Sequence, residues 1–188
     1  TKVTYFSMGK DTSISQESYD RMTMYIVASG WGEFIIGEEP EIIKLQPDEL
    51  LIVPAGTLCG MQTSNGIVYT EIICTGKDIN MNANVKTNEV FALKNLISYE
   101  EGSIANMDVV STPDMKYVLM AFDEGTGLTP HRAPGNAIVF ALEGKAVIGY
   151  EGKDYELSEG ECFRFEKNGL HSVTANGKFK MALLLVLE

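Results

Sequence analysis

The sequence predicts an all-β protein built from two copies of one small domain. Short β-type runs separated by turn residues fill the chain, and the order of runs and turns in the first half returns in the second. A further observation concerns function: the chain has only two histidines, and both lie in the second half. Their positions point to a candidate site.

The β-type runs are clearest in the second half. They are Ala137–Leu142, Lys145–Tyr150, Cys162–Phe165, Leu170–Ala175 and Phe179–Leu187. The turn signals between them are Glu143-Gly144, Glu151-Gly152, Asn168-Gly169 and Asn176-Gly177. Strands at this spacing are typical of a β-sandwich or barrel, and strong helical periodicity is scarce.

The internal repeat predicts the domain organisation. Asn65-Gly66 and the run Ile67–Ile73 match Asn176-Gly177 and the run Lys178–Leu184, at an offset of about 111 to 114 residues. A repeat this long that occurs twice indicates a duplicated domain. We predict one domain over residues 1–74 and a second over 92–188, joined by a polar, asparagine-rich linker or crossing arm at 75–91.

Composition and charge exclude some classes of binding partner. The net charge is −11 and both halves are acidic, so nucleic acid and anionic membranes are not expected to bind. The apolar run Met181–Leu187 is too short to span a bilayer, and no signal-peptide pattern opens the chain. The three cysteines lack CxxC spacing, which favours free thiols and a cytoplasmic location.

Two stretches of the second half resemble the two motifs of the cupin superfamily. The first reads Gly-x5-His-x-Ala-x3-Ala-x6-Gly from Gly125 to Gly144, and the second reads Gly-x5-Glu-x-Asn-x2-His-x3-Ala from Gly160 to Ala175. The first half also fits the second motif between Asp48 and Thr63. The resemblance implies two double-stranded β-helix barrels (jelly rolls) in one chain, a bicupin. The chain would then be a monomer that imitates a cupin dimer, or a homodimer.

The second half is similar to small single-domain conserved-barrel cupins that carry a His-x-Ala-Pro stretch, here His131 to Pro134. In catalytic cupins the resemblance implies a metal held by three histidines and one glutamate. This chain keeps His131 and His171, whereas Ala133 replaces the second histidine and Ala137 replaces the glutamate. Candidate third donors away from the standard positions are Asn136, Asp123 and Glu124.

Strand alternation independently predicts a pocket in the second domain. Side chains two residues apart face the same side of a strand, so His131 and His171 are both expected to face the barrel interior among small residues. The candidate ligand pocket consists of His131, Ala133, Asn136, Ala137, Val139, His171 and Val173. The two histidines are also candidate ligands for one divalent metal (Fe, Mn, Ni or Zn), or they hydrogen-bond to each other, to tyrosine or to water.

The first domain has a poorer set of site residues. Its positions equivalent to the metal ligands are Glu17, Tyr19, Thr23 and Cys59. A set without histidine predicts a degenerate barrel, and Cys59 is interpreted as a buried small side chain.

Two functions follow from these observations. The first is a small-molecule-binding cupin whose pocket surrounds His131 and His171. The alternative is a metal-dependent cupin enzyme, such as an oxygenase, isomerase or decarboxylase, that acts on a small polar organic substrate. A third hypothesis gives the first barrel only an interface role. Fold alone does not choose among them.

Overall fold

The computed structural model describes residues 1–76 and 78–187, and it divides into two compact units. The N-terminal unit consists of residues 1–75 and 83–92. The C-terminal unit consists of the described residues of 76–82 and 93–187. Lys77 of the expected linker and Glu188 of the expected second domain lie outside the described residues. Nearly all regular structure is β-strand, and every strand pair described is antiparallel.

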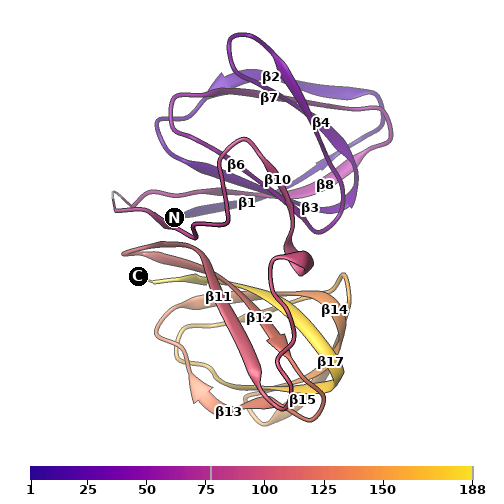
Figure 1. Ribbon diagram of the computed structural model, residues 1–188, viewed down its shortest axis with the longest axis vertical. Helices are drawn as coiled ribbons and strands as arrows, with labels where there is room; N and C mark the ends of the chain where they lie inside the picture. The colour runs from indigo at the N-terminus through magenta and orange to yellow at the C-terminus, as the bar shows by residue number, and fades with distance from the viewer. Residues whose placement is uncertain (77, 188) are drawn as a thin grey trace. The chain divides into compact units, whose positions relative to one another are not determined.

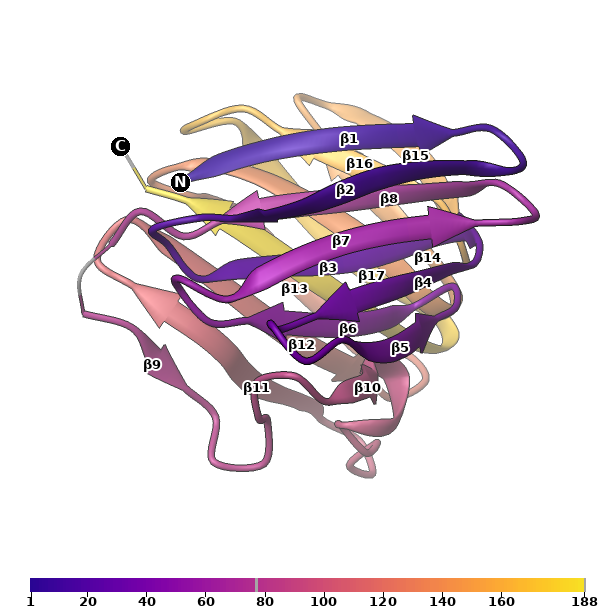
Figure 2. The same ribbon diagram turned by 90° about the horizontal axis from the view of Figure 1, so that it is seen from above.

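The N-terminal unit contains a five-stranded sheet, in the order β1-β8-β3-β6-β10, and a four-stranded sheet, in the order β2-β7-β4-β5. Figures 1 and 2 show these sheets from two directions. The strands are β1 (Lys2–Met8), β2 (Thr12–Ser18), β3 (Thr23–Gly30), β4 (Gly32–Ile36), β5 (Glu41–Leu45), β6 (Glu49–Val53), β7 (Leu58–Thr63), β8 (Ile67–Ile73) and β10 (Val90–Ala92).

Alternate residues of these strands form the core of the N-terminal unit. Tyr25 and Val27 of β3 pack with Phe34 of β4, Leu51 of β6 and Met61 of β7. All are less than a tenth exposed. Because each large apolar side chain removed from water contributes about 1.5–3 kcal/mol, this alternation holds the two sheets together.

The C-terminal unit has one eight-stranded sheet. Its path is β15-β14-β17-β12-β11-β9, with β13 also paired to β17 and β16 paired to β14. The elements are β9 (Asn80–Met81), the 3-10 helix η1 (Leu93–Asn95), β11 (Ile104–Thr112), β12 (Met115–Phe122), β13 (Gly127–Arg132), β14 (Asn136–Tyr150), β15 (Lys153–Ser158), β16 (Cys162–Phe165) and β17 (Leu170–Val186).

Two predicted turns of the C-terminal unit are bends within long strands. Glu143-Gly144 lies inside β14 and Asn176-Gly177 lies inside β17, so four expected runs merge into two strands. The β14–β17 pairing continues on both sides of Gly144, with register shifts beside it. A bulge changes strand direction without ending the strand, and this lets the sheet curve around its core.

Gly144 and Gly30 occupy corresponding places in the two units. Both have positive φ, 77° and 71°, and a Cβ at either would collide with a backbone carbonyl oxygen, that of Lys178 in β17 or that of Gly66 just before β8. Only glycine fits such a position without strain. Each unit therefore contains the same close approach at the same point of its strand order.

The expected linker at 75–91 contains paired strands. In the C-terminal unit, Met81 of β9 pairs with Val110 of β11, and in the N-terminal unit, Val90 of β10 pairs with Leu51 of β6. β9 starts at Asn80 in an asparagine-rich stretch and β10 has only three residues, so neither forms the longer apolar run that predicts a strand from sequence.

Candidate functional site

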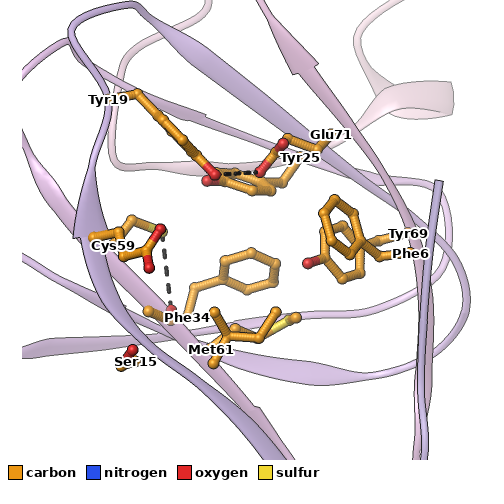
Figure 3. Close-up of a pocket in the computed structure, with 12 residues that line it drawn as sticks. Phe6, Ser15, Tyr19, Tyr25, Phe34, Cys59, Met61, Tyr69 and Glu71 are labelled. Atoms are coloured by element: carbon orange, nitrogen blue, oxygen red, sulfur yellow. Dashed lines mark hydrogen bonds between the residues drawn. The ribbon is translucent and has the colours of Figure 1, made fainter. Parts of the chain in front are cut away.

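A cavity of about 170 Å³ lies inside the N-terminal unit. Figure 3 shows its side chains: Tyr19, Tyr25 and Glu71 lie on one side, and Phe34 and Met61 lie on the other. The full lining is Phe6, Ile14, Ser15, Glu17, Tyr19, Tyr25, Phe34, Cys59, Gly60, Met61, Tyr69 and Glu71. Apolar walls with a few convergent polar groups are the usual composition of small-molecule sites.

Strand β8 supplies the most unusual member of this lining. Ile67, Tyr69 and Glu71 alternate along β8, so they face the same side of the sheet. Ile67 and Tyr69 belong to the core of the unit, and this places the Glu71 carboxyl inside as well. Glu71 is 5% exposed, a rare environment for a carboxylate.

Glu71 has a weak hydrogen-bond partner. The Tyr19 hydroxyl donates to its Oε2 at 3.4 Å, and this is its one hydrogen bond among the described residues. Burial raises the pKa of Glu71, whereas the hydrogen bond from Tyr19 and the charge of Lys2 lower it, and the charge of Glu17 raises it. The carboxyl is therefore a desolvated acid whose acceptor capacity is mostly unused.

The thiol of Cys59 and the phenols of Tyr25 and Tyr69 are held in their neutral forms. Burial raises the pKa of Cys59 to about 11, even though a hydrogen bond with Tyr25 lowers it. Burial also raises the pKa values of Tyr25 and Tyr69. At neutral pH the cavity therefore presents hydroxyl groups, a thiol and a carboxyl, and Cys59 is a poor nucleophile.

The backbone relates this cavity to the predicted histidine site. Glu17 lies opposite Cys59 in the β2–β7 pair, directly after a register shift. His131 lies opposite His171 in the β13–β17 pair, also directly after a register shift. The positions equivalent to the two histidines thus line the cavity of the N-terminal unit.

The structure brings His131 and His171 together. Their ring centroids are 4.3 Å apart, and the His171 ring also stacks on Phe165 at 4.2 Å. His171 is buried at 7% exposure, but His131 is exposed. The expectation that both face the interior therefore fails for His131, because β13 has β17 as its one partner among the described strands and its residues 129–132 are exposed.

Both imidazoles use the same nitrogen for a backbone hydrogen bond. Nδ1 of His131 lies 2.8 Å from the carbonyl oxygen of Thr129, and Nδ1 of His171 lies 2.9 Å from that of Gly169. A carbonyl only accepts, so Nδ1 carries the proton and Nε2 of a neutral ring keeps its lone pair. Burial lowers the pKa of His171, the bond to Gly169 raises it, and the charge of His131 lowers it further.

The other predicted pocket residues lie mainly in the core of the C-terminal unit. Ala137, Val139 and Val173 are at most 2% exposed and pack in one cluster with Phe165. The side chain of Asn136 is engaged with the backbone, since its Oδ1 accepts from the amide of Lys167 at 3.1 Å. Ala133 accepts a backbone hydrogen bond from Asn168 at 2.9 Å.

An open groove does lie beside His171, but it contains none of the other predicted pocket residues. Its lining is Pro130, Gly149, Tyr150, Gly152, Lys153, Asp154, Leu170, His171 and Ser172. The interior space predicted from small residues is thus occupied by aromatic side chains of other strands.

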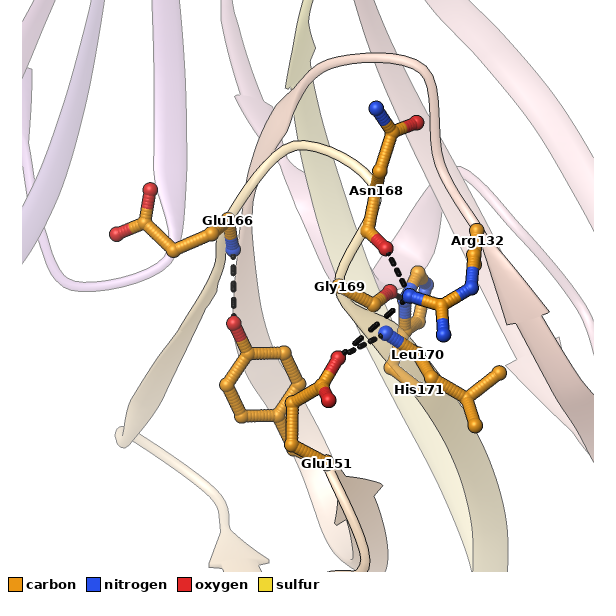
Figure 4. Close-up of polar contacts among 8 residues, drawn as sticks. Arg132, Glu151, Glu166, Asn168, Gly169, Leu170 and His171 are labelled. Atoms are coloured by element: carbon orange, nitrogen blue, oxygen red, sulfur yellow. Dashed lines mark hydrogen bonds and ion pairs between the residues drawn. The ribbon is translucent and has the colours of Figure 1, made fainter.

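A polar cluster covers the turn next to His171 (Figure 4). Arg132 donates to the carbonyl oxygen of Asn168 and lies 3.7 Å from Oε1 of Glu151. Glu151 also accepts from the amide of Leu170 at 2.6 Å. Arg132 thus holds the turn that precedes His171 (Figure 4).

The metal hypothesis requires more donors than the site provides. Within the residues that the structure describes, no three histidine, cysteine, aspartate or glutamate side chains are grouped to hold a metal ion. His131 and His171 alone fall short of the three or four protein donors that zinc and iron sites normally use. The arrangement does not fit a resident catalytic metal.

Sequence reasoning identified the positions of Glu17, Tyr19 and Cys59 but missed Glu71, Tyr69 and Phe6. One signal was available, because Glu71 is a charged residue within the apolar run Ile67–Ile73. An acid at an inward position of a buried strand indicates a function or a partner.

The comparisons with known proteins agree with this architecture. Residues 118–187 match the family model of the cupin domain. This part of the chain is similar to a cupin domain. It contains His131 and His171, the two residues that the cupin motifs pointed to in the sequence.

Solved structures resemble a larger part of the chain. The cupin 2 conserved barrel domain protein from Leptotrichia buccalis has a TM-score of 0.84 and 27% identity, covering 98% of this chain and 82% of that one. A mutant of salicylate 1,2-dioxygenase from Pseudoaminobacter salicylatoxidans has a TM-score of 0.71 and 11% identity, covering 98% and 69%. A cupin superfamily protein from Desulfitobacterium hafniense has a TM-score of 0.54 and 20% identity, covering 56% and 96%.

The last two likenesses show the fold alone, whereas the first supports membership of the cupin superfamily. A search of curated proteins gave no match. Among the described residues, no helix has the length and apolar character needed to cross a membrane.

Proposed function

We propose that the protein is a bicupin that binds a small organic molecule in the cavity of the N-terminal unit. The observation that carries this proposal is the cavity itself, lined by aromatic rings and a buried carboxyl, Glu71. A polar group buried without full pairing costs stability, so its retention in a core favours a binding role.

Repeated backbone details support a duplicated barrel. The amide of Gly56 donates to the carbonyl of Tyr19 at 2.7 Å, and the amide of Asn168 donates to the carbonyl of Ala133 at 2.9 Å. Gly56 and Asn168 both have positive φ, 76° and 61°. Each bond ties the second motif of its unit to the first, and the two bonds are about 112 to 114 residues apart, within the sequence repeat.

The two units have different interiors at equivalent positions. Glu17 and Cys59 of the N-terminal unit stand where His131 and His171 stand in the C-terminal unit. The unit without these histidines has an open, aromatic and acidic interior, whereas the interior of the other unit packs as an apolar core. This favours binding by the N-terminal unit and a structural role for the C-terminal interior.

The size of the cavity limits the ligand. A protein cavity of about 150 Å³ holds a molecule as large as benzene, so 170 Å³ suits a ligand of roughly one ring or a short branched chain. Such ligands bind weakly in absolute terms, because each ligand atom contributes at most about 1.5 kcal/mol.

The test is to block the cavity from its wall. Ser15 lines the cavity, whereas Ser18, on the same strand and also exposed, does not. A library of small polar fragments is screened by thermal shift against the wild type, Ser15→Trp and Ser18→Trp. A ligand of the folded state raises the melting temperature. We expect hits that stabilise the wild type and Ser18→Trp but not Ser15→Trp. Equal stabilisation of all three proteins would place binding elsewhere.

A second candidate function uses the histidine pair. The exposed position of His131 and the free Nε2 atoms of both rings favour recognition of a hydrogen-bond donor, or of a metal that brings its own further ligands. The likeness to salicylate 1,2-dioxygenase, at 11% identity, shows only the fold, so no oxygenase chemistry is carried over. Metal analysis of protein purified without a histidine tag tests this candidate. Stoichiometric metal that is lost in His131→Ala would support it, and metal-free protein would exclude a resident metal.

A further inference from the structure

We infer that the cavity of the N-terminal unit selects a small organic ammonium ion, held between aromatic ring faces and the carboxylate of Glu71. This inference rests on the proposed function and adds the chemical class of the ligand. Three features of the lining carry it: the sign of its charges, the arrangement of its rings and the incomplete pairing of Glu71.

The charged side chains of the lining are all acidic. Glu71 lies inside the cavity and Glu17 lies on exposed β2, and no lysine, arginine or histidine belongs to the lining. Lys2, an exposed residue outside the lining, is the basic side chain whose charge lowers the pKa of Glu71. An anionic ligand would meet like charges in a desolvated space, whereas a cation would be attracted.

Aromatic rings form much of the remaining wall. Phe6 stacks on Tyr69 with ring centroids 5.0 Å apart, and Tyr25 and Phe34 are 5.0 Å apart at 54°. The Phe34 ring meets Tyr69 edge to face at 6.1 Å. Rings inclined to each other turn their electron-rich faces in several directions, and a cation near such faces gains about 0.5–2 kcal/mol per ring.

Glu71 lacks the partner that a buried carboxylate requires. Its hydrogen bond from Tyr19 is long, 3.4 Å, and burial raises its pKa. An ammonium group would supply the missing counter-charge in a water-poor space, where such pairs are strong. A neutral ligand would leave the carboxyl unpaired or protonated.

The sharpest test uses pairs of probes that have the same shape and differ in charge. Choline is paired with 3,3-dimethylbutan-1-ol, and benzylammonium is paired with benzyl alcohol. Each probe is titrated into the wild type, Glu71→Gln and Glu17→Gln, with binding followed by protein NMR. Glu41→Gln serves as the control, because it removes one exposed carboxylate outside the lining.

We expect at least one cation to bind more tightly than its neutral partner. Glu71→Gln should weaken binding of the cation by about 10- to 100-fold, which is the usual contribution of a hydrogen bond to a charged group. Binding of the neutral partner should be nearly unchanged. Glu17→Gln, at the exposed side of the cavity, should weaken binding of the cation less, and Glu41→Gln should not change it. If Glu71→Gln does not fold, Glu17→Gln and the probe pairs still decide the question.

The outcomes separate the inference from the proposed function. Neutral probes that bind as well as the cations, in a manner blocked by Ser15→Trp, would overturn the ammonium inference and leave cavity binding intact. Cations that bind Ser15→Trp and wild type equally would overturn both. No response to any of the four probes at millimolar concentration would overturn the inference, while the fragment screen would still test the cavity.

Discussion

Cys59 lies directly opposite Glu17 across the β2–β7 pair. The same backbone arrangement places His171 opposite His131 across β13–β17. One strand geometry therefore carries an acid and a thiol in one unit and two imidazoles in the other. In the N-terminal unit these side chains border a cavity.

Glu71 should make the ligand-free protein less stable as the pH rises. Because burial raises its folded pKa above the unfolded value, the folded state retains a proton that the unfolded state releases between these two pKa values. Its contribution to the free energy of unfolding therefore falls as pH rises through that window and stays low above the folded pKa.

Thermal unfolding of wild type and Glu71→Gln from pH 4 to 8 measures this effect. As pH rises, the melting temperature of Glu71→Gln should increase relative to that of the wild type. For a chain of this size the change is about 2–4 °C for each kcal/mol of difference in the free energy of unfolding. Glu41→Gln, an exposed change, should show no such trend. A difference that is constant with pH would show that Glu71 is not desolvated.

Gly30 and Gly144 should tolerate alanine much less well than another glycine of similar φ. Gly152 has φ of 80° with nothing within 4 Å of an added Cβ, so Gly152→Ala should cost only the left-handed conformation, about 1–2 kcal/mol. Gly30→Ala and Gly144→Ala add a collision with a backbone carbonyl and should cost roughly twice as much or more. Denaturant unfolding measures all three. Equal losses of unfolding free energy in the three variants would contradict the close approach of a backbone carbonyl to Gly30 and Gly144.

The sequence predicted the all-β class and most of the strands, because turn residues and apolar alternation are local signals. It could not tell Glu143-Gly144, a bend inside β14, from Glu151-Gly152, which lies between β14 and β15. Both contain a glycine with positive φ, and the difference depends on which strands continue to pair with β17. Pairing is a long-range property that no short window contains.

The candidate site was harder to predict, because the motifs are recognised mainly by their histidines. The motifs led to His131 and His171, and the structure does bring these rings together. The motifs did not mark Glu17 or Cys59 as site residues, since this pair without histidine is a poor metal site. Both residues nevertheless line the cavity. Whether small residues leave a space depends on aromatic side chains from distant strands, such as Phe165 beside His171.

His171 should titrate below the usual range for histidine. Burial lowers its pKa, so the folded state stays neutral where the unfolded chain binds a proton, and its contribution to stability is complete above the unfolded pKa and lost as pH falls toward the folded one. Since the charge of His131 lowers this pKa too, His131→Gln should raise it.

Long-range ¹H–¹⁵N NMR follows both points, and with two histidines assignment is simple. The neutral His171 ring should be the Nδ1–H tautomer, because Nδ1 donates to Gly169. An Nε2–H tautomer, or a pKa unaffected by His131→Gln, would show that the ring pair is not as described.

Cys59 should react slowly with alkylating agents at neutral pH. Its pKa of about 11 leaves little thiolate, and its rate should rise about tenfold per pH unit below that value. The exposed Cys162 provides an internal reference. Peptide mapping by mass spectrometry after iodoacetamide treatment should find Cys162 modified before Cys59, and a cavity ligand should protect only Cys59. Modification of Cys59 first at neutral pH would contradict its burial.

Mapping backbone amide shifts during titration with a ligand that binds is the most direct test of whether the N-terminal cavity is the ligand site. The largest changes should fall on Tyr19, Cys59 and Glu71, on three separate segments that meet at the cavity. These changes should disappear in Ser15→Trp. Changes concentrated around His131 and His171, with the cavity residues unmoved, would contradict the assignment of this cavity as the ligand site.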